Sequence, residues 1–490
     1  MTRPRTARPG PTRRELLGGA LALAACTRPM RAPARRFEQP IVVDVHCHDF
    51  NASDLPITGF IARTIPGLTE ITRGVTPIPE QILRRVVGTI HGWLNAEAPS
   101  ADAEVPQLHA ALASGGVIAA APPLAMPRAI FDRLAAQIGG LLGLDQAALG
   151  EGFFQLAETL HLVSHPRARI AASLATIYPT VSLFAPLLVD YDAWTDDHAA
   201  SSLASQVPAN ELVARLSMRG CIGRPDARLH PFIAFDPLRV GGLAIVQQAV
   251  LRSGFIGVKM YPPVGFLPLG NAQLGGNPAR GQALDAALRG LYALCETEEI
   301  PITAHASPGN EFALGYGEMA APVRWAPVLR EFPNLRLNFG HFGHETGAGG
   351  QGGIEARNAW MRQAAELMTA YPHVYADLSS SPLVYDAAYA ARFGPHLREL
   401  CARFPRVPLR VMYGSDWWLN RFDPRGETAV AAFQRFLGEW VEPAREAIMG
   451  RNALRFLGFL DEDDRLATGN RNQQRLRAFY GDEPLPAWLG

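Results

Sequence analysis

Ile41-Val42-Val43-Asp44-Val45-His46-Cys47-His48-Asp49, near the start of the chain, is the stretch that decides the fold. An apolar, β-branched run predicts a buried strand, and successive side chains on a strand point to opposite faces. His46 and His48 therefore point to one side, and Cys47 points to the other. Two imidazoles side by side at a strand end can begin a chelate for zinc or a similar ion. Taken alone, the motif is equally compatible with two unrelated strand histidines.

Seven further segments have the character of short buried strands: 183–190, 229–236, 256–261, 301–305, 335–341, 374–378 and 409–416. Segments of helical periodicity separate or follow them: 211–218, 243–252, 283–296, 323–332, 356–370, 387–404, 428–437 and 444–456. Strands that alternate with amphipathic helices predict a parallel α/β fold, and eight of them predict a (β/α)8 TIM barrel. The active site of such a barrel lies at the C-terminal ends of the strands.

Polar side chains recur at these predicted strand ends. The set comprises His46, His48, Lys259, His305, His341 and Asp416. Each histidine taken singly could be a core residue with satisfied hydrogen bonds. Their joint occurrence at the ends where a barrel carries its chemistry favours a functional site.

Four motifs in this order carry a family resemblance: His46-Cys47-His48, Thr303-Ala304-His305, Gly340-His341 and Gly414-Ser415-Asp416-Trp417. The set resembles the amidohydrolase superfamily of metal-dependent TIM-barrel hydrolases. Within it, the chain is most similar to the amidohydrolase-related group that includes aminocarboxymuconate-semialdehyde decarboxylase-like enzymes. The resemblance spans residues 41–460 apart from a long insertion, and its specificity lies in the ordered set rather than in any single motif.

The resemblance implies a role for each of these residues. It makes His46, His48 and His305 metal ligands, and Asp416 a fourth ligand that also handles a proton. It makes His341 a catalytic residue that polarises substrate or shuttles a proton. The implied metal is Zn²⁺, with Mn²⁺ as the alternative. A divalent ion held by neutral imidazoles brings bound water towards a pKa of about 7, and a neighbouring carboxylate can accept its proton.

Lys259 has two interpretations. Some amidohydrolases carry a carboxylated lysine on strand four that bridges two metals, and Lys259 is placed where that residue would be. The alternative, which we favour, is an unmodified lysine that pairs with an acid or holds a substrate carboxylate. Weaker candidates for the mouth of the site, each equally compatible with structural hydrogen bonding, are Tyr261, Asn338, His344, Asp377 and Ser379.

The N-terminus has the chemistry of an export signal. Thr12-Arg13-Arg14-Glu15-Leu16-Leu17 resembles a twin-arginine (Tat) signal, and Leu23-Ala24-Ala25-Cys26 resembles a bacterial lipobox. We expect residues 1–26 to be the signal, 27–40 a linker, and the mature protein a periplasmic or cell-surface lipoprotein anchored through Cys26. The alternative is a Tat signal cleaved elsewhere, with Cys26 discarded.

The remaining segments are an insertion at 51–180 and a polar C-terminal tail at 461–490. The insertion has helical segments at 78–88, 105–113, 128–142 and 153–162, and we expect it to cover the site or to form a contact in a homo-oligomer. Lys plus Arg and Asp plus Glu each number 46, so the chain lacks the basic excess of a nucleic-acid-binding protein. We expect a small-molecule substrate.

These observations favour a metal-dependent hydrolase that uses activated water on an ester, lactone or amide bond. The first alternative is a nonoxidative decarboxylase, because the same ligands can support protonation of a carbon and release of carbon dioxide. A basic residue that anchors a carboxylate would favour it, and Arg324 and Arg421 are candidates. The second alternative is a non-catalytic binding lipoprotein.

Overall fold

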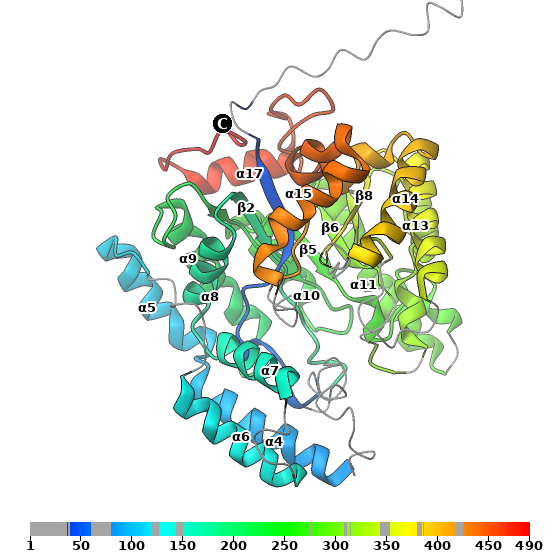
Figure 1. Ribbon diagram of the computed structural model, residues 1–490. Coiled ribbons are helices and arrows are strands. Elements are labelled where there is room, and N and C mark those ends of the chain that lie inside the picture. Colours follow the sequence, from blue (N-terminus) through cyan, green and yellow to red (C-terminus); the bar gives the residue numbers. More distant parts are fainter. Residues whose placement is uncertain are drawn as a thin grey trace, which may run out of the picture. The chain divides into compact units, whose positions relative to one another are not determined.

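The strand expected at residues 41–49 is β1 (Val42–Cys47), which begins a ring of parallel strands (Figure 1). The others are β2 (Val181–Pro186), β3 (Arg228–Leu229), β4 (Phe232–Ala234), β5 (Gly257–Met260), β6 (Ile302–His305), β7 (Leu337–Gly340), β8 (Val374–Asp377) and β9 (Val411–Met412). Every paired neighbour runs parallel. The predicted α/β class is therefore confirmed.

The computed structural model describes residues 37, 40–59, 80–118, 127–143, 150–195, 197–274, 276–307, 311–313, 315–343, 353–379, 385, 387–417 and 425–490. The predicted signal with Cys26 lies outside the described residues, and so does the predicted linker apart from Phe37 and Pro40. His344 and Arg421 also lie outside them. Residues Phe37–Gly490 form one compact unit.

β3 and β4 occupy one position in the ring. They are separated by His230 and Pro231, and a proline has no backbone N–H with which to continue a ladder. Regular pairing gives two sheets, in the orders β1-β2-β3 and β4-β5-β6-β7-β8-β9. The first seam between them is joined by a parallel bridge from Leu187 to Phe232.

The second seam lies between β9 and β1. The backbone N–H of Val45 donates to the carbonyl of Tyr413 at 3.3 Å, and that of Asp416 donates to the carbonyl of His46 at 2.7 Å. With both seams bridged, the nine strand segments form eight positions of a (β/α)8 barrel, as the sequence predicted. The second seam also carries two of the expected site residues.

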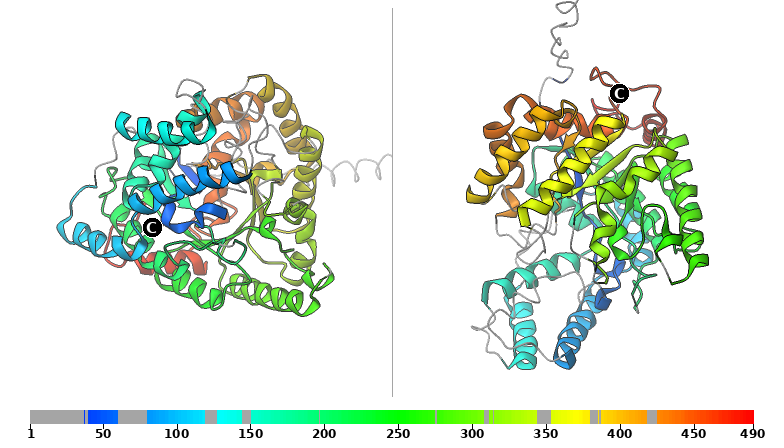
Figure 2. Two further views of the ribbon diagram at one scale, coloured as in Figure 1. Left: turned by 90° about the horizontal axis from the view of Figure 1, so that it is seen from below. Right: turned by 90° about the vertical axis from the view of Figure 1, so that its right-hand side faces the viewer.

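Helices surround the strands (Figure 2, left). They are α8 (Arg167–Ile177), α9 (Leu203–Met218), α10 (Gly242–Arg252), α11 (Pro278–Thr297), α12 (Ala326–Glu331), α13 (Gly353–Ala370), α14 (Ala387–Arg403), α15 (Ala429–Trp440) and α16 (Asn452–Phe456). Each helix segment expected after a strand lies within or overlaps one of these helices. None of the helices in the described part of the chain has the length and hydropathy of a membrane span.

The insertion between β1 and α8 is helical, as expected. It contains α4 (Glu80–Glu97), α5 (Ala101–Ser114), α6 (Arg128–Leu142) and α7 (Gly150–Val163). α5 packs against α9 of the barrel, whereas α6 contacts both α4 and α7, and these three helices lie beyond the end of β1 (Figure 1). They are thus placed at the end of the barrel where the strand carrying His46 and His48 finishes.

A buried ionic network joins this insertion to the barrel. Arg167, the first residue of α8, binds Glu104 of α5 at 2.8 Å through Nη1, and it binds Asp54 after β1 at 3.0 Å through Nε. Asn51 donates to the same Glu104 oxygen at 3.0 Å. Burial raises the pKa of Glu104 to about 7, although the Arg167 charge opposes that shift. The guanidinium therefore holds three segments together.

The stretch 461–490 is not the free surface tail that its polar composition suggested. It forms α17 (Arg471–Tyr480), and its apolar side chains join a second hydrophobic cluster with Val43 and Val45 of β1. The buried members from this stretch are Leu476, Tyr480, Trp488 and Leu489. These few apolar residues lie among many polar ones, so mean composition concealed them.

Arg167→Met tests the network. It keeps most of the side-chain volume but leaves two buried carboxylates without their cation, so we expect the free energy of unfolding in urea to fall by about 3–5 kcal/mol. Arg128→Met is the matched control, because Arg128 and Asp132 form an exposed pair at 2.9 Å on α6. That change should cost about 0.5 kcal/mol or less. Equal losses in the two variants would contradict the role given to Arg167.

Candidate metal centre

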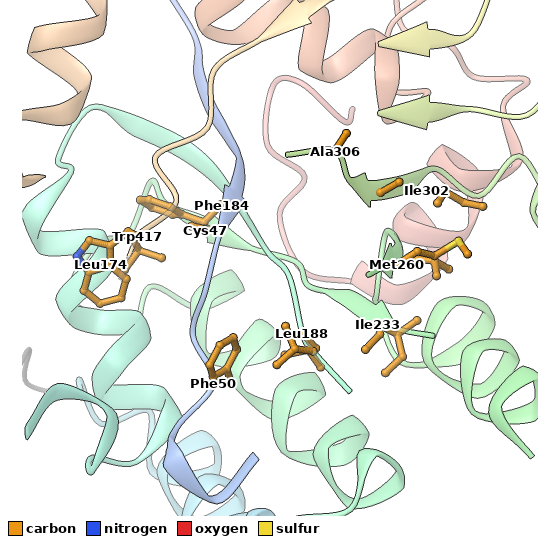
Figure 3. Close-up of a cluster of buried hydrophobic side chains, with 14 of the residues drawn as sticks. Cys47, Phe50, Leu174, Phe184, Leu188, Ile233, Met260, Ile302, Ala306 and Trp417 are labelled. Carbon is orange, nitrogen blue, oxygen red and sulfur yellow. The ribbon is translucent and has the colours of Figure 1, made fainter. Parts of the chain in front are cut away.

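The β1 side chains alternate as the sequence predicted. The rings of His46 and His48 lie on the same side of the strand, with centroids 5.7 Å apart and planes nearly perpendicular. Cys47 points the other way, into a hydrophobic cluster with Leu174 and Trp417 (Figure 3). The apolar packing of Cys47 therefore fixes which face of the strand presents the imidazoles.

Asp416 completes a group of three buried donors with these histidines. Nε2 of His48 lies 3.2 Å from Oδ1 of Asp416, and Nε2 of His46 lies 3.7 Å from the same oxygen. One ligand atom from each residue lies within 4.8 Å of the other two. Nitrogen and carboxylate donors at this spacing suit a divalent transition metal.

The hydrogen bond of His48 Nδ1 gives further support for a metal ion at this group. Nδ1 of His48 lies 2.8 Å from the carbonyl oxygen of Leu187, which can only accept, so Nδ1 carries a proton. In a neutral imidazole, Nε2 then presents a lone pair to the Asp416 carboxylate. Two electron-rich atoms at 3.2 Å need a proton or a cation between them. The donor set therefore fits a metal ion.

Two glycines of the sequence motifs make room for His46. A Cβ on Gly340 would lie 2.9 Å from Cε1 of His46, and a Cβ on Gly414 would lie 2.6 Å from its Cβ. The site residue that soon follows each glycine has a left-handed backbone, with φ of 67° at His341 and 57° at Asp416. Non-glycine residues in this conformation are uncommon and cluster at functional sites.

His305 and His341 lie beside this group. Nδ1 of His305 is 3.2 Å from Nε2 of His341, and the rings of His341 and His46 have centroids 4.5 Å apart. Nε2 of His305 is buried and has no hydrogen-bond partner among the described residues, as expected of an atom reserved for a metal. His305 does not belong to the groups whose ligand atoms lie within 4.8 Å of one another. Burial and the neighbouring His46 lower the pKa of His341 to about 3.

Asp377, at the end of β8, is a hydrogen-bond acceptor for several parts of the site. It lies 3.1 Å from Nδ1 of His46, and it accepts from Nδ2 of Asn338 at 2.7 Å and from the backbone N–H of His341 at 3.1 Å. Burial alone would raise the pKa of Asp377, but the imidazoles of His46 and His341 and the hydroxyl of Ser379 hold it below its usual range. Asp377 also forms a second potential ligand group with His46 and His341. Because its oxygens already accept these hydrogen bonds, we interpret this group as support for the first one.

The sequence left two interpretations open for Asn338, Asp377 and Ser379. They could line the mouth of the site, or they could make structural hydrogen bonds. All three are fully buried and bonded to site residues, so they lie behind the donors and orient them. Their position shows them to be support for the histidines. Nothing in their spacing in the sequence revealed which histidines they contact.

Lys259, at β5, faces the donor group. Its Nζ lies 3.4 Å from Nε2 of His46, and burial lowers its pKa to about 8. At neutral pH the amine is still mostly protonated. Lys259 is thus a cation beside the donors, in the place expected from the sequence.

Aromatic residues flank His305. The ring of Tyr261 lies against it with centroids 4.3 Å apart, and Tyr191 packs edge-on to Tyr261 at 5.3 Å. Tyr191 was not singled out in the sequence. Its only signal was its place directly after the segment expected to form the second strand.

Comparison with known families agrees with this site. Residues 160–459, more than half of the chain, match the amidohydrolase family. The chain belongs to the amidohydrolase family. The matched region of the chain contains His305, His341 and Asp416. It does not contain His46 and His48, which the barrel places beside Asp416. Membership supports an enzyme, and the His/Asp donors indicate a divalent metal.

Solved structures give weaker similarities. An amidohydrolase from Burkholderia multivorans with bound zinc is 17% identical, with 58% of this chain and 87% of that one covered and a TM-score of 0.38. An uncharacterized TIM-barrel protein from Bordetella bronchiseptica is 18% identical, with 61% and 84% covered and a TM-score of 0.38. These values are too low to transfer a substrate or a metal to this family member. No curated protein matches the sequence.

Proposed function

We propose that this protein is a metal-dependent hydrolase that cleaves an ester, lactone or amide bond of a small molecule. The observation that supports it most is the convergence of three buried donors, His46, His48 and Asp416, with Nε2 of His48 3.2 Å from Oδ1 of Asp416. Family membership supports the same class of enzyme.

The residues that would hold the ion are His46, His48, His305 and Asp416. A site richer in imidazole than in oxygen favours Zn²⁺, and Mn²⁺ is the alternative. When bound, such an ion supplies Lewis acidity, which polarises a carbonyl oxygen and lowers the pKa of water. The buried, unpartnered Nε2 of His305 supports its inclusion as the third nitrogen.

The protein's own groups would orient the substrate and move the proton. A cation held by the donor group would keep the buried Asp416 as a carboxylate, because a nearby opposite charge favours the ionised form. One of its oxygens could then take a proton from the attacking water and deliver it to the leaving group. His341 acts on the site through His305, because its Nε2 lies 3.2 Å from Nδ1 of His305. Lys259 can bind an oxygen of the substrate.

A second reaction, nonoxidative decarboxylation, is favoured by one observation. Lys259 places a buried cation beside the donors, where it could anchor a carboxylate. Arg324, the other described candidate anchor, is exposed on a 3-10 helix at Pro322–Trp325 that packs on the outer helix α13. We place hydrolysis first because Asp416 and the donor group suffice for it.

Turnover of simple probes tests the proposal. We expect the purified protein to hydrolyse p-nitrophenyl acetate, dihydrocoumarin or an aryl anilide, to lose this activity with dipicolinate, and to regain it with Zn²⁺ or Mn²⁺. Asp416→Asn should lower kcat by about 10²–10⁴-fold. His109→Ala, an exposed histidine on α5, is the control and should leave the rate unchanged.

Two outcomes would contradict the proposal. Full hydrolysis of the probes after chelation would show that the activity does not depend on a metal in the donor group. Release of labelled carbon dioxide from carboxyl-labelled aromatic acids, with no hydrolysis of the probes, would establish the decarboxylase instead.

We also propose that the protein is exported and held at a membrane by a lipid on Cys26. The support is the order of twin arginine, short apolar run and Leu23-Ala24-Ala25-Cys26 in the sequence. In a Tat-competent bacterium, the chain should partition into the detergent phase of Triton X-114, and Cys26→Ser should move it to the aqueous phase. Cys401→Ser, the same change at a half-buried free cysteine of α14, is the matched control. Detergent partition that survives Cys26→Ser would refute the anchor.

A further inference from the structure

A chain of buried hydrogen-bonding groups runs from Asp377 through Ser379 and His341 to His305. The Ser379 hydroxyl contacts Oδ1 of Asp377 and lies 2.9 Å from Nδ1 of His341. Nε2 of His341 then lies 3.2 Å from Nδ1 of His305. None of the four side chains is more than 4% exposed, so water does not compete for these contacts.

The direction of the first hydrogen bond is set by Asp377. Its oxygens already face N–H donors from Asn338 and from the backbones of His341 and Ser379, so it acts as an acceptor. A serine hydroxyl has one hydrogen and two lone pairs. Ser379 therefore gives its hydrogen to Asp377, and its oxygen is left to accept.

The direction of the Ser379 hydrogen bond determines those of the next two hydrogen bonds. Because the Ser379 oxygen accepts, Nδ1 of His341 must carry a proton, and Nε2 of the neutral ring then has the lone pair. The contact of that nitrogen with Nδ1 of His305 is favourable only if Nδ1 of His305 carries a proton. Nε2 of His305 is consequently a lone pair, and it is the buried atom that has no partner among the described residues.

The other two histidines of the site, His46 and His48, also face a hydrogen-bond acceptor with Nδ1. Nδ1 of His46 faces Asp377 at 3.1 Å and the Ser379 oxygen at 2.9 Å, and Nδ1 of His48 faces the carbonyl of Leu187 at 2.8 Å. Their Nε2 atoms both face Asp416 Oδ1, and Nε2 of His46 also lies 3.4 Å from Nζ of Lys259. Nε2 of His341 is instead occupied by His305, which explains why His341 serves the site without being a ligand.

We propose that Ser379 is a positioning residue that sets the tautomers of His341 and His305, so that Nε2 of His305 is presented as a lone pair to the metal. This inference rests on the metal site proposed above. Without the hydroxyl, Nδ1 of His341 has lost its acceptor, and His341 can instead donate from Nε2 to Nδ1 of His305. The proton of His305 then moves to Nε2 and blocks the ligand atom.

Nitrogen-15 NMR of metal-free, histidine-labelled protein measures these tautomers directly. We expect Nδ1–H for His305 and His341 in the wild type, assigned by single histidine substitutions. Ser379→Ala should shift His305 towards Nε2–H or a mixture. Ser379→Thr retains the hydroxyl and should restore the wild-type pattern. Ser217→Ala, which removes another buried hydroxyl with two hydrogen bonds on α9, is the control.

Metal affinity, measured by competition with a chelator, gives a second readout. Supporting groups of this kind change affinity by about 10–100-fold, so Ser379→Ala should weaken Zn²⁺ binding by that factor while Ser217→Ala leaves it unchanged. An Nε2–H tautomer of His305 in the wild type, or an unchanged tautomer in a folded Ser379→Ala protein, would overturn the proposal. If Ser379→Ala fails to fold, Ser379→Cys, whose thiol is a weaker hydrogen-bonding group of similar size, takes its place and should shift His305 in the same direction.

The two proposals fail separately. Nδ1–H tautomers in a protein that hydrolyses no probe would support the role of Ser379 and contradict the hydrolase proposal. Wrong tautomers in an active, chelator-sensitive enzyme would remove the role of Ser379 alone.

Discussion

One backbone hydrogen bond, from the N–H of Asp416 to the carbonyl of His46 at 2.7 Å, joins the last strand position to the first. It helps to close the barrel and brings a carboxylate beside two imidazoles. The approach is close enough that Gly340 and Gly414 have no space for a side chain against His46. The left-handed backbones at His341 and Asp416 are held in the same small region. Closure of the fold and assembly of the site are thus one constraint.

The donors need a surrounding that fixes them, because a buried imidazole can turn or change its tautomer. Asp377 and the carbonyl of Leu187 each occupy Nδ1 of one β1 histidine and leave Nε2 for the site. Arg167 acts at a greater distance by fixing the segment after β1 against the insertion. Three insertion helices, α4, α6 and α7, lie beyond the end of β1 (Figure 1), and whether they cover the site or form a contact between copies of the chain stays a prediction.

Much of this architecture could be predicted from local patterns. The β-branched run before His46 and the alternation of strands and helices correctly gave the barrel, and the alternation within β1 correctly separated Cys47 from the histidines. What could not be predicted depends on contacts across the ring. Ser379 lies 333 positions from His46, whose Nδ1 its hydroxyl contacts at 2.9 Å, and no spacing rule connects them. Burial of Trp488 in a polar stretch was hidden for the same reason.

Elemental analysis of the purified chain after reconstitution with zinc and manganese, counted per polypeptide, tests the central claim most directly. We expect about one ion, bound by the histidines of β1 and β6 with Asp416. About two ions would contradict the single site and make Lys259 a carboxylated bridge with His341 as a ligand. No ion under any loading condition would contradict the metal centre itself and leave the barrel as a binding module.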